Sequence, residues 1–356
     1  MGIEKNLPDS SPPGLVGLAL ETGLEAWAES RGWPAYRGRQ IEHWLFERSE
    51  LAPDAMSDLP ANLRNELTSE GFSPRLAIVR KSESRDGTAK ILFRTREGAF
   101  VESVVIPAGK RTTLCLSSQI GCGVGCGFCA SGMRGVRRNL DADEIVEQFL
   151  LSRHAAEGMD RRVTNVVMMG MGEPMHNVDN VLAALGTLHD PKRIHFGARR
   201  ITVSTVGIAQ GVERLTGSGR PYTLAFSLHA PNDAIRRRIV PLKAAMTVRE
   251  IRDAGARYMA TTGRKVTFEY VLLKGINDHP EDARELAQLL RGVPGVVNLI
   301  PYNPVEGLEF ERPTDRAIHG FADLLERRGT RVSLRLRKGA DIDAACGQLA
   351  LKSSQQ

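Results

Sequence analysis

The sequence has no segment that would place the protein in or across a membrane. None of its apolar runs approaches the roughly 20 residues that a membrane-spanning helix needs. Its first residues, Met1-Gly-Ile-Glu-Lys-Asn, lack the basic and then apolar pattern of a secretory signal peptide. Hydrophobic residues make up 42% and charged residues 25%, which is ordinary for a soluble globular chain. We therefore expect a cytoplasmic protein with no membrane partner.

Cysteine is scarce, with five in 356 residues, and three of the five stand together. In a chain without an export signal, clustered cysteines indicate metal binding or catalysis more often than a disulfide framework. The run Gly121-Cys122-Gly-Val-Gly-Cys126-Gly-Phe128-Cys129 has the spacing C-x3-C-x2-C. Three thiolates can bind three irons of a 4Fe–4S cluster and leave one iron open, as in catalytic rather than structural metal sites.

Acidic residues are outnumbered, with a net charge of +6 and a pI of about 9.2. Residues 1–95 carry a net charge of −2 and the rest of the chain +8. Arg134, Arg137 and Arg138 follow the cysteine cluster, and Arg236–Arg238 and Arg335–Lys338 follow predicted strands. A basic excess favours a polyanionic partner such as RNA, but a solvated arginine-rich surface has the same composition.

The apolar pattern changes along the chain, and no internal repeat is present. Helical spacing gives way to alternation typical of a β-meander, and then to alternating strands and helices. We expect a flexible N-terminus at 1–14, a helical accessory domain at 15–75, a β-meander at 76–107, a catalytic core at 108–348 and a flexible tail at 349–356.

Beyond residue 110 the alternation implies parallel strands joined by right-handed crossovers, in either an open sheet or a barrel. The predicted strands are 113–117, 163–169, 200–204, 223–228, 266–273, 296–300 and 331–336. The predicted helices are 141–157, 177–189, 247–260, 281–291 and 315–328.

Candidate functional residues follow these strands, where parallel α/β proteins place their sites. They are Gly172 and Glu173, Ser204, Ser227 with Leu228 and His229, and Asn303. Glu173 could accept hydrogen bonds from an ammonium group. Singly, each has a structural interpretation: Ser204 as a helix cap, Gly172 in a tight turn, His229 as a structural hydrogen-bonding residue and Asn303 as a turn former. Their gathering on one rim favours a binding site.

Two further cysteines stand apart from the cluster. Cys115 lies within the first strand of the alternating region, and its position favours a small buried hydrophobic residue. Cys346 lies beyond the last strand in a polar stretch flanked by glycine, which suits a mobile and accessible thiol.

Longer motifs carry a resemblance to a known family over about residues 30–350. The motifs are Cys115-Leu-Ser-Ser-Gln-Ile-Gly-Cys122, Arg138-Asn-Leu140, Asn165-Val-Val-Met-Met-Gly-Met-Gly-Glu173-Pro, Ser227-Leu-His-Ala-Pro-Asn-Asp233, Phe268-Glu-Tyr-Val271, Val297-Asn-Leu-Ile-Pro301 and Asp341-Ile-Asp-Ala-Ala-Cys346-Gly-Gln-Leu349. They resemble the RlmN/Cfr family of radical S-adenosylmethionine (SAM) RNA adenine methyltransferases. The departures are small: Val206 where serine is common, and Ser131 where threonine is common.

The resemblance implies a fold, cofactors and partners. The fold is an α/β open partial (βα)6 TIM-like barrel with a small helical N-terminal domain and a short β-meander. The cofactors are a 4Fe–4S cluster and SAM, with two SAM molecules per turnover. The partners are 23S rRNA, tRNA and an electron donor such as flavodoxin or ferredoxin, and the protein is expected to be a monomer.

The resemblance also implies a role for each site residue. Cys122, Cys126 and Cys129 would bind the cluster, and Gly172, Glu173, Ser204, Ser227, Leu228, His229 and Asn303 would bind SAM. Glu102, Cys115 and Cys346 would be catalytic, with Glu102 as a proton acceptor and Cys115 paired with Cys346.

The extra thiols suit methylation at an unreactive carbon, because an aromatic C–H of adenine is neither acidic nor nucleophilic. Cys346 would take a methyl group from one SAM, and a 5'-deoxyadenosyl radical from a second SAM would take hydrogen from that methyl group. The carbon radical would then add to carbon 2 of adenine. Proton loss and attack by Cys115 on the Cys346 sulfur would release the product and leave a disulfide.

Two alternatives stay open. The first is the Cfr-type reaction at carbon 8, which uses the same residues. The second is a non-catalytic RNA-binding protein with a structural metal, which predicts a fourth local metal ligand. The sequence near Cys129 offers no such ligand.

Overall fold

A computed structural model describes residues 13–133, 135–241, 243–335 and 337–349. The expected flexible termini fall almost wholly outside these ranges, as do Arg134 and residue 336 at the end of the last predicted strand.

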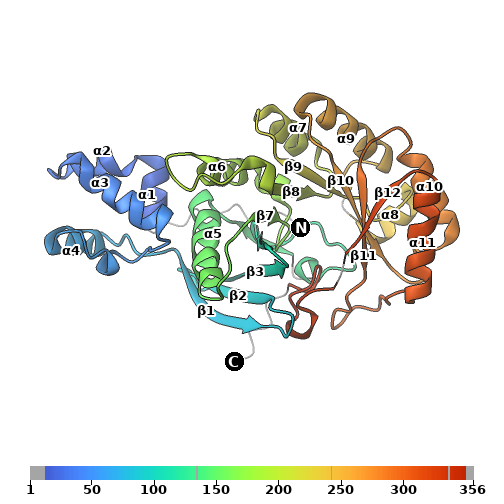
Figure 1. Ribbon diagram of the computed structural model, residues 1–356, viewed down its shortest axis with the longest axis horizontal. Coiled ribbons are helices and arrows are strands. Elements are labelled where there is room, and N and C mark those ends of the chain that lie inside the picture. Colours follow the sequence, from blue (N-terminus) through green and yellow to red (C-terminus); the bar gives the residue numbers. More distant parts are fainter. Residues whose placement is uncertain (1–12, 134, 242, 336, 350–356) are drawn as a thin grey trace.

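Helices and strands alternate after a helical N-terminal segment (Figure 1). The α-helices are α1 (Leu15–Glu21), α2 (Leu24–Ser30), α3 (Ala35–Glu42), α4 (Ala61–Ser69), α5 (Ala142–Glu157), α6 (Val178–His189), α7 (Ala209–Gly217), α8 (Asp233–Ile239), α9 (Val248–Thr262), α10 (Pro280–Leu289) and α11 (Asp315–Arg327). The strands are β1 (Leu76–Glu83), β2 (Ala89–Thr95), β3 (Phe100–Ala108), β4 (Arg111–Leu116), β5 (Gln119–Gly121), β6 (Val136–Asn139), β7 (Asn165–Met168), β8 (Ile201–Thr205), β9 (Thr223–Ser227), β10 (Thr267–Leu272), β11 (Val296–Pro301) and β12 (Arg331–Leu334).

One large sheet organises the molecule, in the order β1-β2-β3-β4-β7-β8-β9-β10-β11-β12. From β4 onward every neighbouring pair is parallel. Among the described residues β12 pairs only with β11, so the curved sheet stays open. Six strand-and-helix units followed by β12 confirm the expected α/β open partial (βα)6 barrel.

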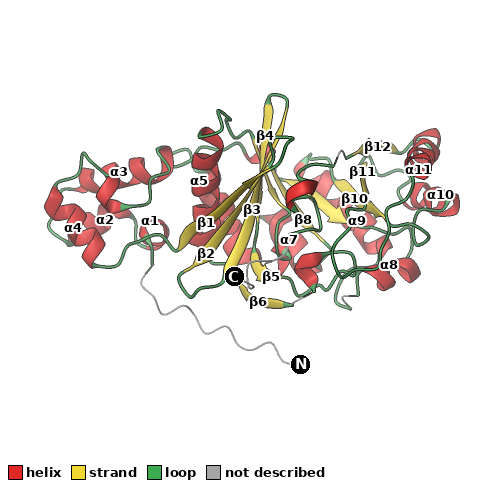
Figure 2. Ribbon diagram, turned by 90° about the horizontal axis from the view of Figure 1, so that it is seen from below, coloured by secondary structure: helices red, strands yellow, loops and turns green. Residues whose placement is uncertain are grey.

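The meander is a continuation of the same sheet, because β3 pairs antiparallel with β4 (Figure 2). In the register, Leu92 pairs with Glu102 and Val104 pairs with Cys115. Since side chains alternate between faces along a strand, Glu102 and Cys115 project from the same face.

The helices lie where their apolar faces are covered. Helices α1 to α4 form one end of the molecule, and α9, α10 and α11 lie outside the parallel strands (Figures 1 and 2). Helices α7 and α8 were missed by the sequence pattern; α7 has glycine at 211 and 217, and α8 is only seven residues long. In the described part of the chain, no helix combines the length and apolarity needed to span a membrane.

Candidate active site

The candidate residues converge on a cavity at the carboxyl ends of the parallel strands. Its walls include nine residues singled out from the sequence: Cys122, Cys126, Cys129, Gly172, Glu173, Ser204, Ser227, His229 and Cys346. Cavities with an apolar lining and a few convergent polar groups are the usual binding sites of small molecules and cofactors. The gathering of these residues from five separate strand ends supports a binding site over separate structural roles.

The cluster loop joins β5 to β6 and turns its three thiols toward the cavity. Burial raises the pKa of Cys122 to about 12 and the pKa values of Cys126 and Cys129 above the usual range, and neighbouring thiolates add smaller effects in the same direction. Thiols bind metals as thiolates, so binding here would release protons. The described residues contain no group of three or more His, Cys, Asp or Glu arranged around a single metal ion. Three thiols that face a shared cavity fit a 4Fe–4S cluster, whose irons are ligated separately.

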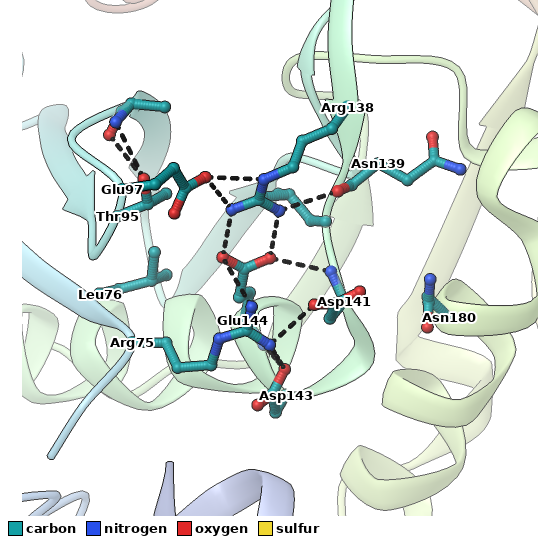
Figure 3. Close-up of polar contacts among 12 residues, drawn as sticks. Arg75, Leu76, Thr95, Glu97, Arg138, Asn139, Asp141, Asp143, Glu144 and Asn180 are labelled. Carbon is teal, nitrogen blue, oxygen red and sulfur yellow. Dashed lines mark hydrogen bonds and ion pairs between the residues drawn. The ribbon is translucent and has the colours of Figure 1, made fainter. Parts of the chain in front are cut away.

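The strand that follows this loop is held by a network of ion pairs (Figure 3). The Arg138 guanidinium on β6 donates to both carboxylate oxygens of Glu144 at 2.7 and 2.8 Å, and its Nε donates to Glu97 at 2.7 Å. Arg75 donates to Asp141 and Asp143 at the start of the same helix, α5. Arg138 therefore anchors the cluster loop and does not present a free cation.

The turn after β7 requires glycine and fixes a buried carboxylate. Gly172 has a φ of 99°, and a Cβ there would lie 2.6 Å from the Cβ of Gln119. Glu173 is 3% exposed, and burial raises its pKa. One oxygen accepts from the backbone N–H of Met175 at 3.0 Å, and the other from that of Val206 at 2.9 Å. Glu173 therefore joins the ends of β7 and β8 while it lines the cavity.

The ends of β8 and β9 supply hydroxyl groups. The Oγ atoms of Ser204 and Ser227 lie 3.3 Å apart, and both residues line the cavity. The Leu228 side chain is fully buried outside the cavity lining. Arg236, for which the sequence left open a polyanion contact or a solvated surface, is only 4% exposed and donates to the carbonyls of Val206, Ser227, Leu228 and Met246. Both interpretations are wrong for Arg236, because its guanidinium satisfies buried backbone carbonyls.

His229 is buried against the cluster loop, with its ring 4.9 Å from that of Phe128. Burial, with a smaller effect of Arg236, lowers the pKa of His229 to about 3, so the ring is neutral. Its Nδ1 accepts from the backbone N–H of Val271 at 3.1 Å, which places the ring proton on Nε2. His229 can therefore offer one N–H donor.

Cys346 is exposed and lines the cavity near the end of β12. Arg335, at the end of that strand, donates to the Cys346 sulfur at 3.6 Å. The Asn303 side chain donates to the backbone carbonyl of Cys346 at 3.2 Å and does not line the cavity. Asn303 thus holds the loop that carries Cys346.

Cys115 and Glu102 lie behind this wall rather than on it. The Cys115 thiol is buried, and burial together with the nearby Cys346 sulfur raises its pKa to about 12. Diagonal neighbours on adjacent antiparallel strands lie about 7–8 Å apart, which is the relation of Glu102 to Cys115. Glu102 is 3% exposed, and one of its carboxylate oxygens lies 3.1 Å from Lys90 Nζ.

Sequence reasoning missed several polar residues of the cavity. Glu269 and Arg335 line it, although Glu269 lies within β10. Oxygen Oε1 of Glu269 accepts from Asn298 at 2.8 Å, and Oε2 accepts no hydrogen bond from the described residues. The quoted motif Phe268-Glu-Tyr-Val271 contained Glu269, but nothing in the motif indicated that this side chain faces the cavity.

Comparisons with known proteins agree over most of the chain. Residues 116–289 match the radical SAM superfamily, and residues 14–71 match the ribosomal RNA large subunit methyltransferase N-terminal domain. The chain is 45% identical over 328 residues to a probable dual-specificity RNA methyltransferase RlmN of Rhodopirellula baltica, which covers 92% of this chain and 88% of that protein. It is 44% identical to the protein of the same name from Synechococcus elongatus, over 99% of this chain and 97% of the other. The crystal structure of a radical SAM methyltransferase from Sphaerobacter thermophilus has 45% identity and a TM-score of 0.91, covering 95% of this chain and 99% of that one.

Proposed function

The chain belongs to the RlmN family of radical SAM RNA methyltransferases, and we propose that it methylates carbon 2 of adenine in 23S rRNA and in tRNA, through a methyl group carried by Cys346. Methylation of RNA with SAM and a 4Fe–4S cluster is the activity of the family. The position on adenine, the two RNA substrates and the carrier cysteine are the parts that are proposed.

One observation carries the proposal: an exposed thiol lies on one wall of the cavity with a buried thiol behind it, and neither belongs to the cluster loop. Cys346 lines the cavity together with Cys122, Cys126 and Cys129, and Cys115 lies close behind Cys346. Methyl transfer to a nucleophilic atom of RNA would need neither of them. Two thiols that can react with each other support a covalent route through sulfur.

Cys346 is suited to accept the methyl group. It is accessible, and the Arg335 guanidinium lies 3.6 Å from its sulfur, where it can orient that sulfur toward the cavity. The cluster and SAM, bound in this cavity, supply the methyl group and the radical chemistry that activates it. Asn303 and Arg335 orient the loop and the sulfur while the resulting carbon bonds to the adenine ring.

Glu102 and Cys115 complete the reaction. The adduct first formed on the adenine ring is a radical. The C–H bond at carbon 2 breaks, its proton passes to the Glu102 carboxylate and its electron pair stays in the ring, while the unpaired electron of the adduct passes to a one-electron acceptor, a role that the oxidised cluster would fill. The Cys115 sulfur then bonds to the Cys346 sulfur, and the bond between Cys346 and the methylene carbon breaks. Its electron pair goes to that carbon, which takes up a proton and becomes the methyl group. The two thiols are thereby oxidised to a disulfide, which an external reductant must reduce.

The remaining cavity residues bind the cofactors in this proposal. Cys122, Cys126 and Cys129 hold the cluster, and Gly172, Glu173, Ser204, Ser227, Leu228, His229 and Asn303 form the SAM site, with Leu228 and Asn303 contributing through the backbone and loop that they position. The N–H of His229 and the hydroxyl groups of the two serines are donors of the kind that a nucleoside and a carboxylate require.

The substrates and partners are proposed from the relatives. The relatives named dual-specificity RNA methyltransferase favour carbon 2 over the Cfr-type carbon 8 reaction and favour both rRNA and tRNA as substrates. A flavodoxin or ferredoxin would supply the electrons. Mass spectrometry of nucleosides from rRNA and tRNA of a complemented deletion strain tests the position, and methyl groups at carbon 8 would refute it.

Substitution of the two thiols tests the mechanism. Cys346→Ala should carry no methyl group and form no product, because the acceptor sulfur is absent. Cys115→Ala should be methylated at Cys346 and should then stall as a covalent RNA adduct that survives denaturation. Normal turnover by Cys115→Ala, or methylated Cys346 without an adduct, would show that the two-thiol route is wrong.

A further inference from the structure

Lys90 on β2 is in contact with two parts of the proposed machinery. Its Nζ lies 3.1 Å from an oxygen of Glu102, and it also donates to the backbone carbonyl of Asp343 at 3.2 Å. Asp343 belongs to the segment Gly339–Gln348, here named the carrier loop, which bears Cys346. The Lys90 side chain is 14% exposed and that of Glu102 is 4% exposed, so both charges are largely withdrawn from water.

The strand register explains why one ammonium reaches both partners. Lys90 pairs with Val104, and Leu92 pairs with Glu102, so Lys90 and Glu102 are diagonal neighbours on one face. Val104 in turn pairs with Cys115 across β3 and β4. Lys90, Glu102 and Cys115 therefore share the face on which the carrier loop lies.

The start of the carrier loop is fastened to the turn between β1 and β2. The N–H of Gly339 donates to Asp86 at 3.0 Å, and the Ser84 hydroxyl donates to Asp341 at 2.5 Å. These contacts fix the loop to the meander but do not reach the catalytic groups. Lys90 is the residue that joins this docking to Glu102.

We propose that Lys90 is a positioning residue that couples docking of the carrier loop to proton removal by Glu102. The inference rests on the proposed function of Glu102 and Cys346. When the loop is docked, the Asp343 carbonyl and the Glu102 carboxylate share one ammonium, so the carbon bound to Cys346 and the proton acceptor are held in one arrangement. The carbon 2 proton passes to the carboxylate and the C–H electron pair stays in the ring, so Lys90 gains and loses no atom.

This coupling predicts a defect at one stage of the reaction. Methylation of Cys346 precedes any contact of RNA with Glu102, so it does not need the Lys90 to Glu102 contact. Proton removal does need it, because the ammonium holds the buried Glu102 carboxylate in place beside the docked loop. Without the ammonium, the covalent RNA adduct should form and resolve slowly.

The test compares Lys90→Met, Lys90→Arg and Lys81→Met in single-turnover reactions on RNA. Lys81 is a matched control on β1, where it pairs with Glu83 at 2.8 Å and is opposite Ile91 on the other face. For Lys90→Met we expect S-methyl-Cys346 within about twofold of the wild-type level in the absence of RNA. Methylated RNA should then form about tenfold more slowly or worse, with the adduct accumulating. Lys90→Arg should restore most of the rate, and Lys81→Met should match the wild type.

Two results would overturn the inference alone, given a wild type that methylates RNA. The first is that the Lys90→Met variant forms methylated RNA at the same rate as the Lys81→Met control. The second is that Lys90→Met loses Cys346 methylation and RNA product to the same extent and that Lys90→Arg does not restore either. That result would make Lys90 a general structural residue. If the wild-type protein makes no methylated RNA and the Cys115→Ala variant forms no covalent RNA adduct, the proposed function is overturned, and this inference with it.

Discussion

Replacing Glu173 by alanine should destabilise the protein as well as weaken SAM binding, because the carboxylate has two structural partners. Its oxygens accept from the backbone N–H groups of Met175 and Val206 at 3.0 and 2.9 Å. A buried donor left without a partner costs about 1–3 kcal/mol. Two such donors give a loss of about 2–6 kcal/mol in the free energy of unfolding, against a total of about 5–15 kcal/mol for a typical protein.

The loss is measurable by thermal unfolding of the metal-free protein under anaerobic conditions. An unfolding entropy of about 2.1 cal/mol/K per residue converts 2–6 kcal/mol into a decrease in Tm of about 3–8 °C. Ser204→Ala is the matched control, because Ser204 lines the same cavity and its hydroxyl lies against another hydroxyl at 3.3 Å. Its Tm should stay within about 1 °C of the wild type.

The second half of the prediction is measured by equilibrium titration with SAM on the reconstituted protein. A lost charge-assisted hydrogen bond to the SAM ammonium corresponds to about a ten- to a hundredfold weaker affinity. An unchanged Tm in Glu173→Ala would refute the structural role derived from the two backbone contacts. Unchanged SAM affinity would remove Glu173 from the binding site.

Three further predictions concern the cluster, the glycine turn and a buried carboxyl group. Cys126→Ala should lose both bound iron and sulfide and the formation of 5'-deoxyadenosine, and near-normal iron content would contradict the assignment of this loop. Gly172→Ala should lower the Tm, because its φ of 99° and the 2.6 Å approach to Gln119 exclude a Cβ. The control is Gly186→Ala on α6, which should leave the Tm unchanged because no atom lies within 4 Å of the Cβ position. Burial raises the pKa of Glu147 to about 8, so the folded state binds more protons than the unfolded state between about pH 4.3 and pH 8. Stability should therefore fall as the pH rises through that window. In Glu147→Gln the fall should be smaller, as followed by urea unfolding across pH 5–8.

Local pattern was enough to predict most of the barrel. Every predicted strand and helix beyond residue 110 has its counterpart, with ends that differ by at most two residues, because alternating apolar runs and helical spacing are properties of neighbouring residues. The short helices α7 and α8 and the β5–β6 pair were missed because they carry too little local pattern. Packing against the sheet and the cluster loop stabilises them more than their own sequence does.

The side-chain partners could not be predicted in this way. Arg236 and Arg138 were interpreted as surface cations, and both are turned inward to carbonyl and carboxylate oxygens. The neighbours of Glu269 and Lys90 are determined by the strand register, which pairs residues that are far apart in the chain. A single sequence shows that a charged residue is present, but only the register shows which charge faces it.

The burial of the two reacting thiols gives an order to their reactions. A thiol with a pKa of about 12, as burial gives Cys115, is ionised in only about one molecule in 100,000 at pH 7. Because the thiolate is the nucleophile, Cys115 competes poorly for the methyl group, while the exposed sulfur of Cys346 has a guanidinium beside it. The thiol that must react last is thus the one held protonated. Cys115 reacts once the RNA adduct places the electrophilic sulfur of Cys346 next to it, on the face of the sheet that Cys115 shares with Glu102. Under the proposed mechanism, the same burial that made Cys115 look like an ordinary core residue in the sequence is what keeps the two thiol reactions in sequence.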